Sequence, residues 1–408
     1  MVKKILTINT VFSQGGAAKI ARTLHDVLNK TPGFSSRFAY GRGKKIKSKE
    51  VFSFGVRSEA YLRAFLTRLM GLQGCGSWFS TKRLEGFILK EKFDLIHLHN
   101  LHGYYLDLSF VRFLNKLNIP IVWTLHDAWP ITGRCSYFLD CNRWKTGCGS
   151  CPSLSMYPKT YLDSSALMWK KKKECFTKGW SPVVVCPSWW LADRVKESYL
   201  NKYRVEVIPN GVDTGIFKPK DRVKIQERLK ISPSKKIILF VAADLREERK
   251  GTEYFFEALK YVKTKDCLVL TVGKKINLNQ KTKENIEIKQ LGYMSDNNLI
   301  SDIYNTSDIF CTTSLQDNFP TTILEAMACG IPIIGFKTGG IPEQVSEDCG
   351  ILIESRNVEE LAEGIDELLS NNEKRNKFSL NCRRRVLENY SIEKFKEQYI
   401  NLYKNLLK

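Results

Sequence analysis

Long apolar runs are missing from this sequence. It has no run of 18 or more consecutive apolar residues, and a membrane-spanning helix needs about 20, so we predict no such helix. Internal repeats and low-complexity tracts are absent as well. Residues 1–12 contain two lysines and a short apolar run interrupted by Thr7 and Asn9. This pattern fits a first β-strand better than a signal peptide.

A disulfide framework also has little support. Of the 12 cysteines, four cluster and the other eight are scattered. Most of the scattered ones have apolar neighbours, as Cys186 does in VVVCPS and Cys311 in DIFCTTS. Single buried thiols fit a reducing cytosol better than an oxidising compartment. We therefore expect a cytoplasmic protein.

The four clustered cysteines are Cys135, Cys141, Cys148 and Cys151. Four thiolates favour tetrahedral Zn²⁺, and the x2 spacing of the last pair is the most specific part of the pattern. We predict a closed, structural zinc site here; four free thiols are the alternative. The cluster begins nine residues after His126, so a zinc site would fasten a loop beside that histidine.

Negative charge is scarce relative to positive charge. The sequence has 64 Lys and Arg against 43 Asp and Glu, a formal net charge of +21. Such a charge favours nucleic acid, anionic lipid or phosphorylated substrates. Residues 41–49 are basic and precede an amphipathic segment, 61–72, and residues 169–173 are also basic. Basic charge beside apolar helices is typical of contact with an anionic membrane surface; a merely solubilising surface is the alternative.

Short apolar runs alternate with helical patterns in two blocks. This alternation predicts two doubly wound, Rossmann-like α/β domains, with ligands at the carboxyl ends of the strands. Turn residues cluster at 208–221. We therefore place an N-terminal domain at 1–215, a C-terminal domain at 216–388 and a final helix at 389–408. The predicted strands are 3–9, 93–99, 119–126, 182–188, 205–210, 236–243, 267–273, 286–292, 308–314 and 331–336.

The most informative stretch is 314–330, SLQDNFPTTILEAMACG. Asp317 and Glu325 form a D-x7-E pattern around a helix that we expect to begin near Pro320. The unpaired N–H groups at a helix start suit a phosphate, and Glu325 can accept hydrogen bonds from a ribose diol. The pattern therefore predicts a nucleoside diphosphate site and nucleotide-sugar chemistry.

Two features of the first block fall where strands end. Gly15 and Gly16 follow the first predicted strand and allow a ligand to approach the backbone; an ordinary turn is the alternative. Because G-x-G-x-x-G is absent, dinucleotide binding is a poor match. His126 ends the strand 119–126, a position that suits an active-site histidine. A structural histidine is the alternative.

In the second block, Arg246, Arg249 and Lys250 follow the strand 236–243. They are the candidate cations for a diphosphate. Solvated surface charge is the alternative explanation.

Together these residues resemble the retaining GT-B glycosyltransferases of the family 4 type (glycosyl transferases group 1), which include many enzymes of capsule and exopolysaccharide synthesis. The resemblance covers essentially the whole chain in order and is most specific at 314–343. IPNGVD at 208–213, CPSWWLAD at 186–193 and residues 291–310 also match. The stretch that starts HDAWPITGRC at His126 resembles a subgroup similar to colanic-acid and capsular glycosyltransferases.

The resemblance implies a GT-B architecture. Two Rossmann-like domains face a central cleft, the N-terminal domain binds the acceptor, the C-terminal domain binds the donor, and the last helix crosses back. The loop with Gly15 and Gly16 is expected to close on the donor phosphates and the acceptor. His126 is expected to lie beside the transferred sugar and stabilise the reacting centre.

The donor site is likewise implied by the resemblance. Asp317 takes the place of the first glutamate of the E-x7-E motif of the family and contacts sugar hydroxyls, while Glu325 holds the ribose. Lys250 neutralises the leaving diphosphate, and no catalytic metal is expected. The sugar and phosphate site is lined by Asn318, Phe319, Pro320 and Thr321.

The sequence departs from the family in two places. The aspartate at 317 is about one methylene shorter than a glutamate. The usual Gly-Arg pair is Ala243-Asp244 here, so Arg246 or Arg249 must replace the missing arginine, and the sequence leaves both open.

We therefore predict a retaining hexosyltransferase whose catalysis needs no metal. It would move a hexose from a UDP- or GDP-linked sugar to a hydroxyl of a lipid-linked oligosaccharide, as a peripheral protein on the inner face of the cytoplasmic membrane. One alternative is a zinc-bearing, basic nucleic-acid-binding protein, although no helix-turn-helix or His-ligated finger is visible. Another is a GT-B-like nucleotide-sugar epimerase, which needs no acceptor.

Overall fold

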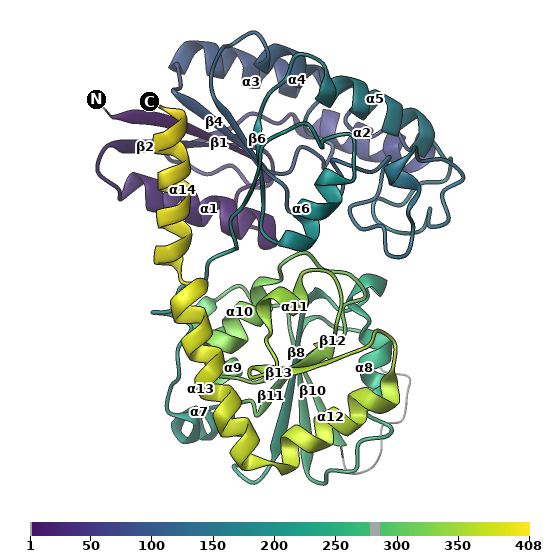
Figure 1. Ribbon diagram of the computed structural model, residues 1–408, viewed down its shortest axis with the longest axis vertical. Coiled ribbons are helices and arrows are strands. Elements are labelled where there is room, and N and C mark those ends of the chain that lie inside the picture. Colours follow the sequence, from purple (N-terminus) through teal and green to yellow (C-terminus); the bar gives the residue numbers. More distant parts are fainter. Residues whose placement is uncertain (1, 278–285) are drawn as a thin grey trace. The chain divides into compact units, whose positions relative to one another are not determined.

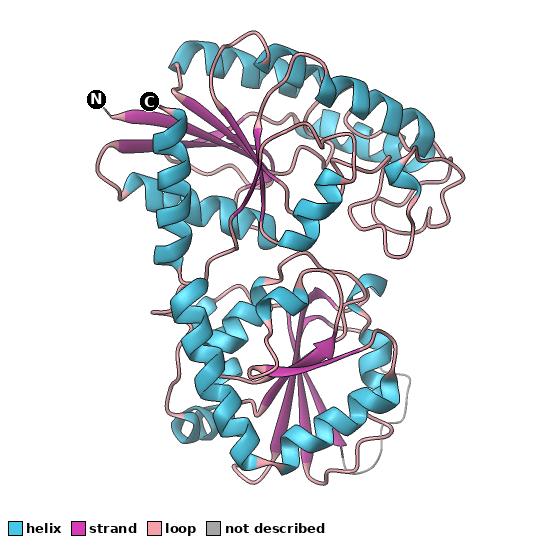
Figure 2. Cartoon of the chain, viewed as in Figure 1, coloured by secondary structure: helices cyan, strands magenta, loops and turns pink. Residues whose placement is uncertain are grey.

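The computed structural model describes residues 2–277 and 286–408. The chain divides into two compact units. The first comprises the chain up to Ile208 together with Lys396–Lys408, and the second is Pro209–Phe395. Each unit contains a parallel sheet with helices packed on it (Figures 1 and 2). The predicted class, two Rossmann-like α/β domains, is confirmed.

The sheet of the first unit has the order β3-β2-β1-β4-β5-β6-β7. Strand β1 (Lys3–Val11) pairs with β2 (Phe34–Arg42) on one side and β4 (Leu95–Leu98) on the other, and both pairs are parallel. The strand order reverses beside β1, and ligands bind such sheets at the carboxyl ends of the strands that flank this reversal. The other strands are β3 (Val51–Ser53), β5 (Ile121–Thr124), β6 (Val183–Cys186) and β7 (Val205–Val207).

The sheet of the second unit has the order β10-β9-β8-β11-β12-β13. Here β8 (Lys236–Asp244) lies between β9 (Cys267–Lys274) and β11 (Ile309–Thr312), again in parallel. The reversal therefore falls beside β8, and the loops after β8 and β11 meet there. The remaining strands are β10 (Ile286–Gly292), β12 (Ile333–Phe336) and β13 (Gly350–Ile353).

Helices connect the strands, and several begin at a side-chain cap. The hydroxyl of Ser188 accepts the N–H of Leu191 at the start of α6 (Trp189–Lys196), and the side chain of Asn357 accepts the N–H of Glu360 at the start of α12 (Val358–Ser370). Such caps satisfy backbone donors that would otherwise lack a partner.

Within the described residues, no helix has both the length and the apolar character needed to cross a bilayer. The helices are α1 (Gly16–Asn29), α2 (Arg57–Met70), α3 (Trp78–Glu91), α4 (Ser109–Leu114), α5 (Ser165–Thr177), α6 (Trp189–Lys196), α7 (Arg222–Leu229), α8 (Thr252–Ala258), α9 (Asn297–Thr306), α10 (Thr321–Ala328), α11 (Ile341–Gln344), α12 (Val358–Ser370), α13 (Asn372–Asn389) and α14 (Ile392–Leu406), with 3-10 turns at Arg143–Lys145 and Glu248–Lys250.

The end of the chain returns to the first unit, as predicted. In α14 the side chains of Tyr399 and Tyr403 are buried. The Tyr399 hydroxyl lies 2.9 Å from Oγ1 of Thr124, and the Tyr403 hydroxyl lies 2.6 Å from Nδ1 of His97. The apolar stripe of this helix therefore packs against the ends of β4 and β5.

The zinc prediction is wrong. Among the described residues, no group of three or more His, Cys, Asp or Glu side chains is placed to hold a metal ion. The sulfur of Cys148 accepts the N–H of Gly133 at 3.1 Å. Burial raises the pKa of Cys135 to about 12 and also raises the pKa of Cys148. Without a metal these groups are therefore neutral thiols. Cys141 and Cys151, the other two predicted ligands, likewise belong to no such group.

A buried arginine fastens this loop instead. Arg134 is 1% exposed. Its guanidinium donates to the carbonyl oxygens of Ser153 (2.8 Å), Leu154 (3.2 Å) and Met156 (3.1 Å), and also to that of Pro158. Because a guanidinium offers five N–H donors in a fixed plane, one side chain can hold several turns of irregular backbone together.

The second basic stretch, 169–173, is only partly a surface feature. Lys172 is buried and donates to the carbonyl oxygen of Trp129. Its ammonium lies 3.9 Å from the centre of the Trp129 ring, and burial lowers its pKa to about 7. This lysine therefore lies in the interior of the first unit and not on its surface.

Candidate active site

The second unit gathers an ion cluster where β8 and β11 end. The carboxylate oxygen Oδ2 of Asp317 lies 2.6 Å from Nζ of Lys250 and 2.9 Å from Nη1 of Arg249. Arg249 also donates to the carbonyl oxygen of Gln316 at 3.0 Å and to Glu247 at 2.9 Å. Burial alone would raise the pKa of Asp317, but Lys250 and Arg249 lower it well below its ordinary value. Asp317 is therefore ionised and orients both cations.

Backbone hydrogen bonds hold the two loops of this cluster together. The N–H of Leu315 donates to the carbonyl oxygen of Arg249 at 2.8 Å, and the Thr313 hydroxyl donates to that of Gly251 at 2.8 Å. The cations from the loop after β8 are thereby fixed beside the carboxylate from the loop after β11. Such pre-orientation is what electrostatic stabilisation of a reacting group requires.

The structure separates the two arginines that the sequence left open. Arg246 is exposed and pairs with Asp244, with Nε–Oδ1 at 2.8 Å and Nη2–Oδ2 at 2.7 Å. The hydrogen bond from Arg246 lowers the pKa of Asp244 further than burial raises it. Arg249, by contrast, is 7% exposed and shares Asp317 with Lys250. Arg249 is therefore the arginine in the cluster.

A short helix starts directly after the cluster. The N–H of Asn318 donates to Oδ1 of Asp317 at 3.0 Å, and α10 begins at Thr321, after Pro320. The carbonyl oxygen of Phe319 accepts Nδ2 of Asn210 at 2.9 Å. This last bond ties the IPNGVD stretch to the loop within the second unit.

Glu325 lies one turn into α10 and is 5% exposed. One of its carboxylate oxygens lies 3.3 Å from the hydroxyl of Tyr304, which also donates to the carbonyl oxygen of Thr322 at 3.1 Å. A buried carboxylate must keep hydrogen-bond donors close. The helix thus carries Glu325 on the same element whose N-terminus follows the ion cluster.

In the first unit, Gly15 and Gly16 form the turn between β1 and α1. Gly15 has φ +85°, a conformation that favours glycine. A Cβ added at either position would meet no atom within 4 Å. Packing within the chain therefore gives no reason for a second glycine at 16, and the open backbone is suited to a close ligand.

His126 belongs to a group of histidines at the ends of β4 and β5. Its Nε2 lies 2.8 Å from Nδ1 of His99, and the two rings stack with an interplanar angle of 17°. The ring of His97 lies 4.2 Å from that of His99. Burial lowers the pKa of His126 to about 4 and that of His97 to about 3, and it lowers the pKa of His99 as well. At neutral pH these imidazoles are uncharged donors and acceptors.

A carboxylate completes this group. Oδ2 of Asp127 lies 2.8 Å from Nε2 of His102, and Oδ1 accepts the N–H of Trp129 at 2.9 Å. Burial would raise the pKa of Asp127, but His102, the N–H of Trp129 and His126 together lower it below its ordinary value. A buried ionised carboxylate therefore follows His126 directly in the chain.

The structure thus brings the predicted residues together in two sets. Arg249, Lys250, Asp317–Thr321 and Glu325 lie together in the second unit, whereas Arg246 is paired apart from them. Gly15, Gly16 and His126 lie at strand ends of the first unit. Sequence reasoning missed His99, His102 and Asp127. The signal was present, because HLHNLH places three histidines at the end of a predicted strand.

Comparison with known proteins gives the class. A family model described as Glycosyltransferase Family 4 matches residues 15–215, and one described as Glycosyl transferases group 1 matches residues 221–385. Sucrose-phosphate synthase from Thermosynechococcus elongatus has the same fold, with a TM-score of 0.75 at 16% identity over 99% of each chain. The fold and these matches define a GT-B glycosyltransferase.

Within this class, the chain belongs to the family 4, group 1 glycosyltransferases. The putative colanic acid biosynthesis glycosyl transferase WcaC of Escherichia coli K12 is 28% identical, over 98% of this chain and 100% of its own length. The UDP-Gal:alpha-D-GlcNAc-diphosphoundecaprenol alpha-1,3-galactosyltransferase of Escherichia coli is 27% identical, over 52% of this chain and 58% of its own length.

Proposed function

We propose that this glycosyltransferase moves a hexose from a UDP- or GDP-linked sugar to a hydroxyl of a lipid-linked oligosaccharide, with retention at the anomeric carbon, in the synthesis of a cell-surface polysaccharide such as a capsule or exopolysaccharide. The name of the galactosyltransferase relative specifies a UDP-sugar donor and an undecaprenyl diphosphate acceptor. The name of the full-length relative specifies colanic acid biosynthesis. Both support this substrate class.

The observation that carries the proposal is the Arg249–Lys250–Asp317 cluster beside the start of α10. Asp317 orients both cations, and Arg249 also pairs with Glu247, whose side chain is partly exposed. The cluster therefore holds two oriented cations directly before the helix start. A nucleoside diphosphate brings the negative charge that such cations and a helix N-terminus attract. Glu325, on the same helix, is suited to accept hydrogen bonds from the ribose hydroxyls.

In the proposed reaction, the bond between the anomeric carbon and the diphosphate oxygen breaks. The acceptor hydroxyl forms the new bond on the same face, and its proton passes to the departing diphosphate oxygen. Lys250 and Arg249 stabilise the negative charge that develops on the diphosphate. We expect these cations to act without a catalytic metal, so that chelation by EDTA leaves turnover unchanged.

The first unit supplies the acceptor side in this proposal. Gly15 and Gly16 let the acceptor and the donor phosphates approach the backbone. His126, held uncharged and stacked on His99, offers a neutral hydrogen-bonding group to the transferred sugar. A neutral donor can stabilise the reacting sugar without adding charge near the forming cation.

We further propose that the protein is peripheral on the inner face of the cytoplasmic membrane. Helix α2 exposes Tyr61, Leu62, Phe65 and Leu69, and the basic segment 41–49 precedes it. Apolar side chains beside cations favour an anionic bilayer surface. Flotation with vesicles that contain anionic lipid, compared with neutral vesicles, tests this association.

A thermal-shift panel of UDP, GDP, ADP and their sugar conjugates tests the donor site. We expect one nucleotide diphosphate to raise Tm, because a ligand that binds only the folded state stabilises it. Glu325→Ala should abolish that shift, whereas Glu363→Ala, at an exposed position of α12, should not. A panel in which no nucleotide stabilises the protein would contradict the proposal, as would an unchanged response of Glu325→Ala. The anomeric configuration of the product, read by NMR, tests retention.

A further inference from the structure

A basic pocket in the first unit is lined by none of the residues assigned to the reaction above. It has a volume of about 1140 Å³ and lies among the ends of β1 and β2, the segment after β3, and helices α2 and α3. Arg42, Lys44, Lys45, Arg57 and Arg83 line it. Among the described residues that line the pocket, none is Asp or Glu. The pocket therefore has a strong preference for an anion.

The backbone fixes the floor of this pocket. A Cβ added at Gly55 would lie 1.6 Å from the carbonyl oxygen of Gly41, so only a glycine lets these segments meet. The hydroxyl of Tyr40 donates to the carbonyl oxygen of Lys44 at 2.7 Å and accepts the N–H of Ile46 at 3.0 Å. The loop that bears the two lysines is thereby held over the strand ends.

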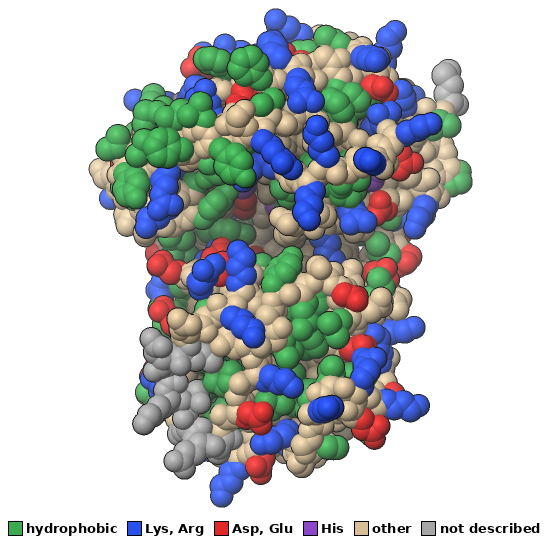
Figure 3. Space-filling model, turned by 180° about the vertical axis from the view of Figure 1, so that it is seen from behind, with side chains coloured by type: hydrophobic (Ala, Val, Ile, Leu, Met, Phe, Trp, Pro, Cys, Tyr) green, Lys and Arg blue, Asp and Glu red, His purple; other side chains and the backbone are tan. Residues whose placement is uncertain are grey.

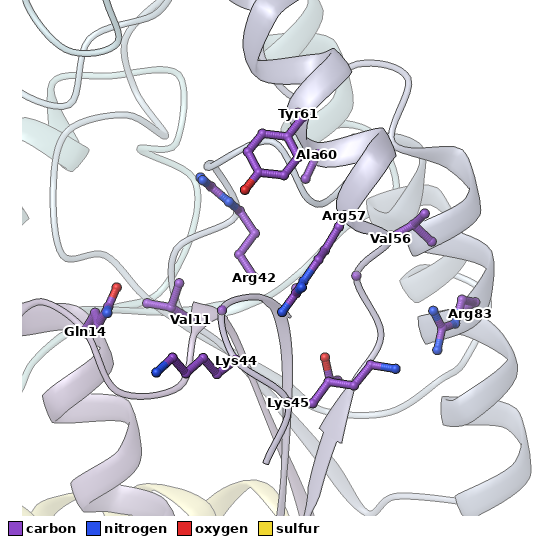
Figure 4. A pocket seen from close by; sticks show the side chains of 14 residues that line it. Val11, Gln14, Arg42, Lys44, Lys45, Val56, Arg57, Ala60, Tyr61 and Arg83 are labelled. Atoms are coloured by element: carbon purple, nitrogen blue, oxygen red, sulfur yellow. The ribbon is translucent and has the colours of Figure 1, made fainter.

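Among residues 2–277 and 286–408, no carboxylate forms an ion pair with the five cations of the pocket. Within the described residues, Arg42 donates to the carbonyl oxygen of Gly103 at 3.1 Å and lies 5.5 Å from the ring centre of Tyr104, and both of these partners are uncharged. Arg57 extends from α2 toward the loop that bears Lys44 and Lys45 (Figure 4). Several cations converging without a carboxylate repel one another, and a bound anion removes that repulsion.

An apolar surface adjoins the pocket. Tyr61 lines the pocket and is 75% exposed; one turn later on α2, Phe65 is 59% exposed. The buried carboxylate of Glu59 on α2 accepts the N–H of Phe79 at 2.9 Å, which fixes the start of α3, with exposed Trp78 and Phe79, beside α2. In Figure 3, hydrophobic side chains gather on the side of this unit where α2 lies, with Lys and Arg side chains around them. A ligand that fills the pocket can therefore also contact exposed apolar side chains.

We infer that the pocket binds the diphosphate of the lipid-linked acceptor, with the start of the lipid chain on the apolar side chains of α2. This inference rests on the proposed function and adds to it a binding site. A diphosphate that joins a lipid to a sugar has one negative charge on each phosphate and requires cations, whereas its lipid requires an apolar surface. Gln14 and Val11 form another part of the lining. Since Gln14 directly precedes Gly15 and Gly16, the acceptor sugars have a path toward that turn.

Calorimetric titration of the full chain with geranyl diphosphate tests the site, because this soluble compound carries a diphosphate and a short prenyl chain. UDP or GDP, whichever stabilises the protein, is kept saturating so that the donor site is filled. We expect Lys45→Gln/Arg57→Gln to weaken geranyl diphosphate binding by about tenfold or more, since two charge-assisted contacts are lost. Lys90→Gln/Lys116→Gln removes the same charge from exposed positions of the first unit outside the pocket, and it should bind as the wild type does.

A second double variant tests the contact between the lipid and helix α2. Tyr61→Ser/Phe65→Ser should weaken geranyl diphosphate binding severalfold and leave inorganic pyrophosphate binding unchanged. Unchanged geranyl diphosphate binding by the pocket variant would overturn the inference, as would an equal loss in the charge-matched control. Glucose 6-phosphate that binds as tightly as geranyl diphosphate would overturn the assignment to a lipid.

The nucleotide thermal shift separates this inference from the proposed function. If the shift persists and geranyl diphosphate does not bind, the pocket assignment alone is wrong. If no nucleotide shifts Tm in any variant, the proposed function is wrong.

Discussion

The two units share the order of their first six strands but place different chemistry at the ends of their strands. In the first unit, β4 and β5 lead into a group of histidines that burial keeps neutral. In the second unit, β8 and β11 lead into an ion cluster around Asp317. All five histidines of the chain precede residue 127 and therefore lie in the first unit. Topology thus decides where a ligand binds, and the loop residues decide which charge it meets.

The largest expected effect comes from removing a cation from the ion cluster of the second unit. Lys250→Ala should lower turnover by about 100- to 1000-fold, because the diphosphate then leaves with one stabilising charge fewer. Steady-state kinetics with the identified donor measures this loss.

Arg246→Ala is the matched control for this prediction. The exposed pair of Arg246 with Asp244 contributes little to stability, and we expect turnover to change by less than about threefold. If Arg246→Ala instead reduced turnover as strongly as Arg249→Ala did, the arginine in the ion cluster would not be the one that serves the diphosphate.

Turnover should respond less strongly to a change in the histidine group of the first unit. His126→Ala removes one hydrogen-bonding group, and we expect turnover to fall by about 10- to 100-fold while donor affinity is nearly unchanged. Kinetics together with nucleotide titration separates the two quantities. His25→Gln is a control elsewhere in the same unit, where His25 contacts Ser36. Loss of donor affinity in His126→Ala with unchanged turnover would contradict the role assigned to the neutral histidine.

Acid should distinguish the two units by stability. His25 and His126 have pKa values lowered to about 4, and His97 to about 3, against about 6.5 in the unfolded chain. Between pH 6.5 and 4 the unfolded chain therefore binds protons that the folded first unit does not. Its stability should fall as pH falls, by about 1.4 kcal/mol per pH unit for each such histidine.

The ion cluster predicts a different acid range for the second unit. The pKa of Asp317 is depressed, so its contribution persists above the ordinary aspartate pKa of about 3.9 and is lost only as pH falls below it. Hydrogen exchange followed by mass spectrometry between pH 7 and 4.5 should show protection falling first in the first unit. Equal loss of protection in both units would remove the electrostatic contrast between them.

Much of the fold was predictable because the buried strands are short apolar runs. The strands that the sequence did not predict are β2, β3 and β13. Strand β2 begins FSSR, and its buried Ser36 is satisfied by the imidazole of His25 and the amide of Asn29. Both partners lie on α1, the helix just before this strand, and they make a polar strand acceptable although its own residues lack the apolar pattern.

The sequence predicted which residues form the candidate site, but it did not predict which of them contact one another. The sequence identified Asp317, Lys250 and both arginines, yet only the three-dimensional turn at Glu248–Lys250 brings Arg249 to Asp317 and leaves Arg246 outside. The zinc prediction failed for a related reason. Cysteine spacing does not show whether the loop that carries the thiols is already closed by other contacts. Here Arg134, just before Cys135, joins the two ends of that loop by binding carbonyl oxygens that follow Cys151.

The smallest expected effect is in that loop, where the guanidinium of Arg134 binds neutral carbonyl groups. Cys148→Ser retains an acceptor for the N–H of Gly133, so we expect the free energy of unfolding to change by less than about 1 kcal/mol. Arg134→Met should cost about 3 kcal/mol, since several buried carbonyl groups lose their donor. Denaturant unfolding of both variants measures the difference. Because the loop depends on the guanidinium, the ranking should be the same with and without a chelator; a larger loss for Cys148→Ser would mean that the sulfur has a structural role beyond this single contact.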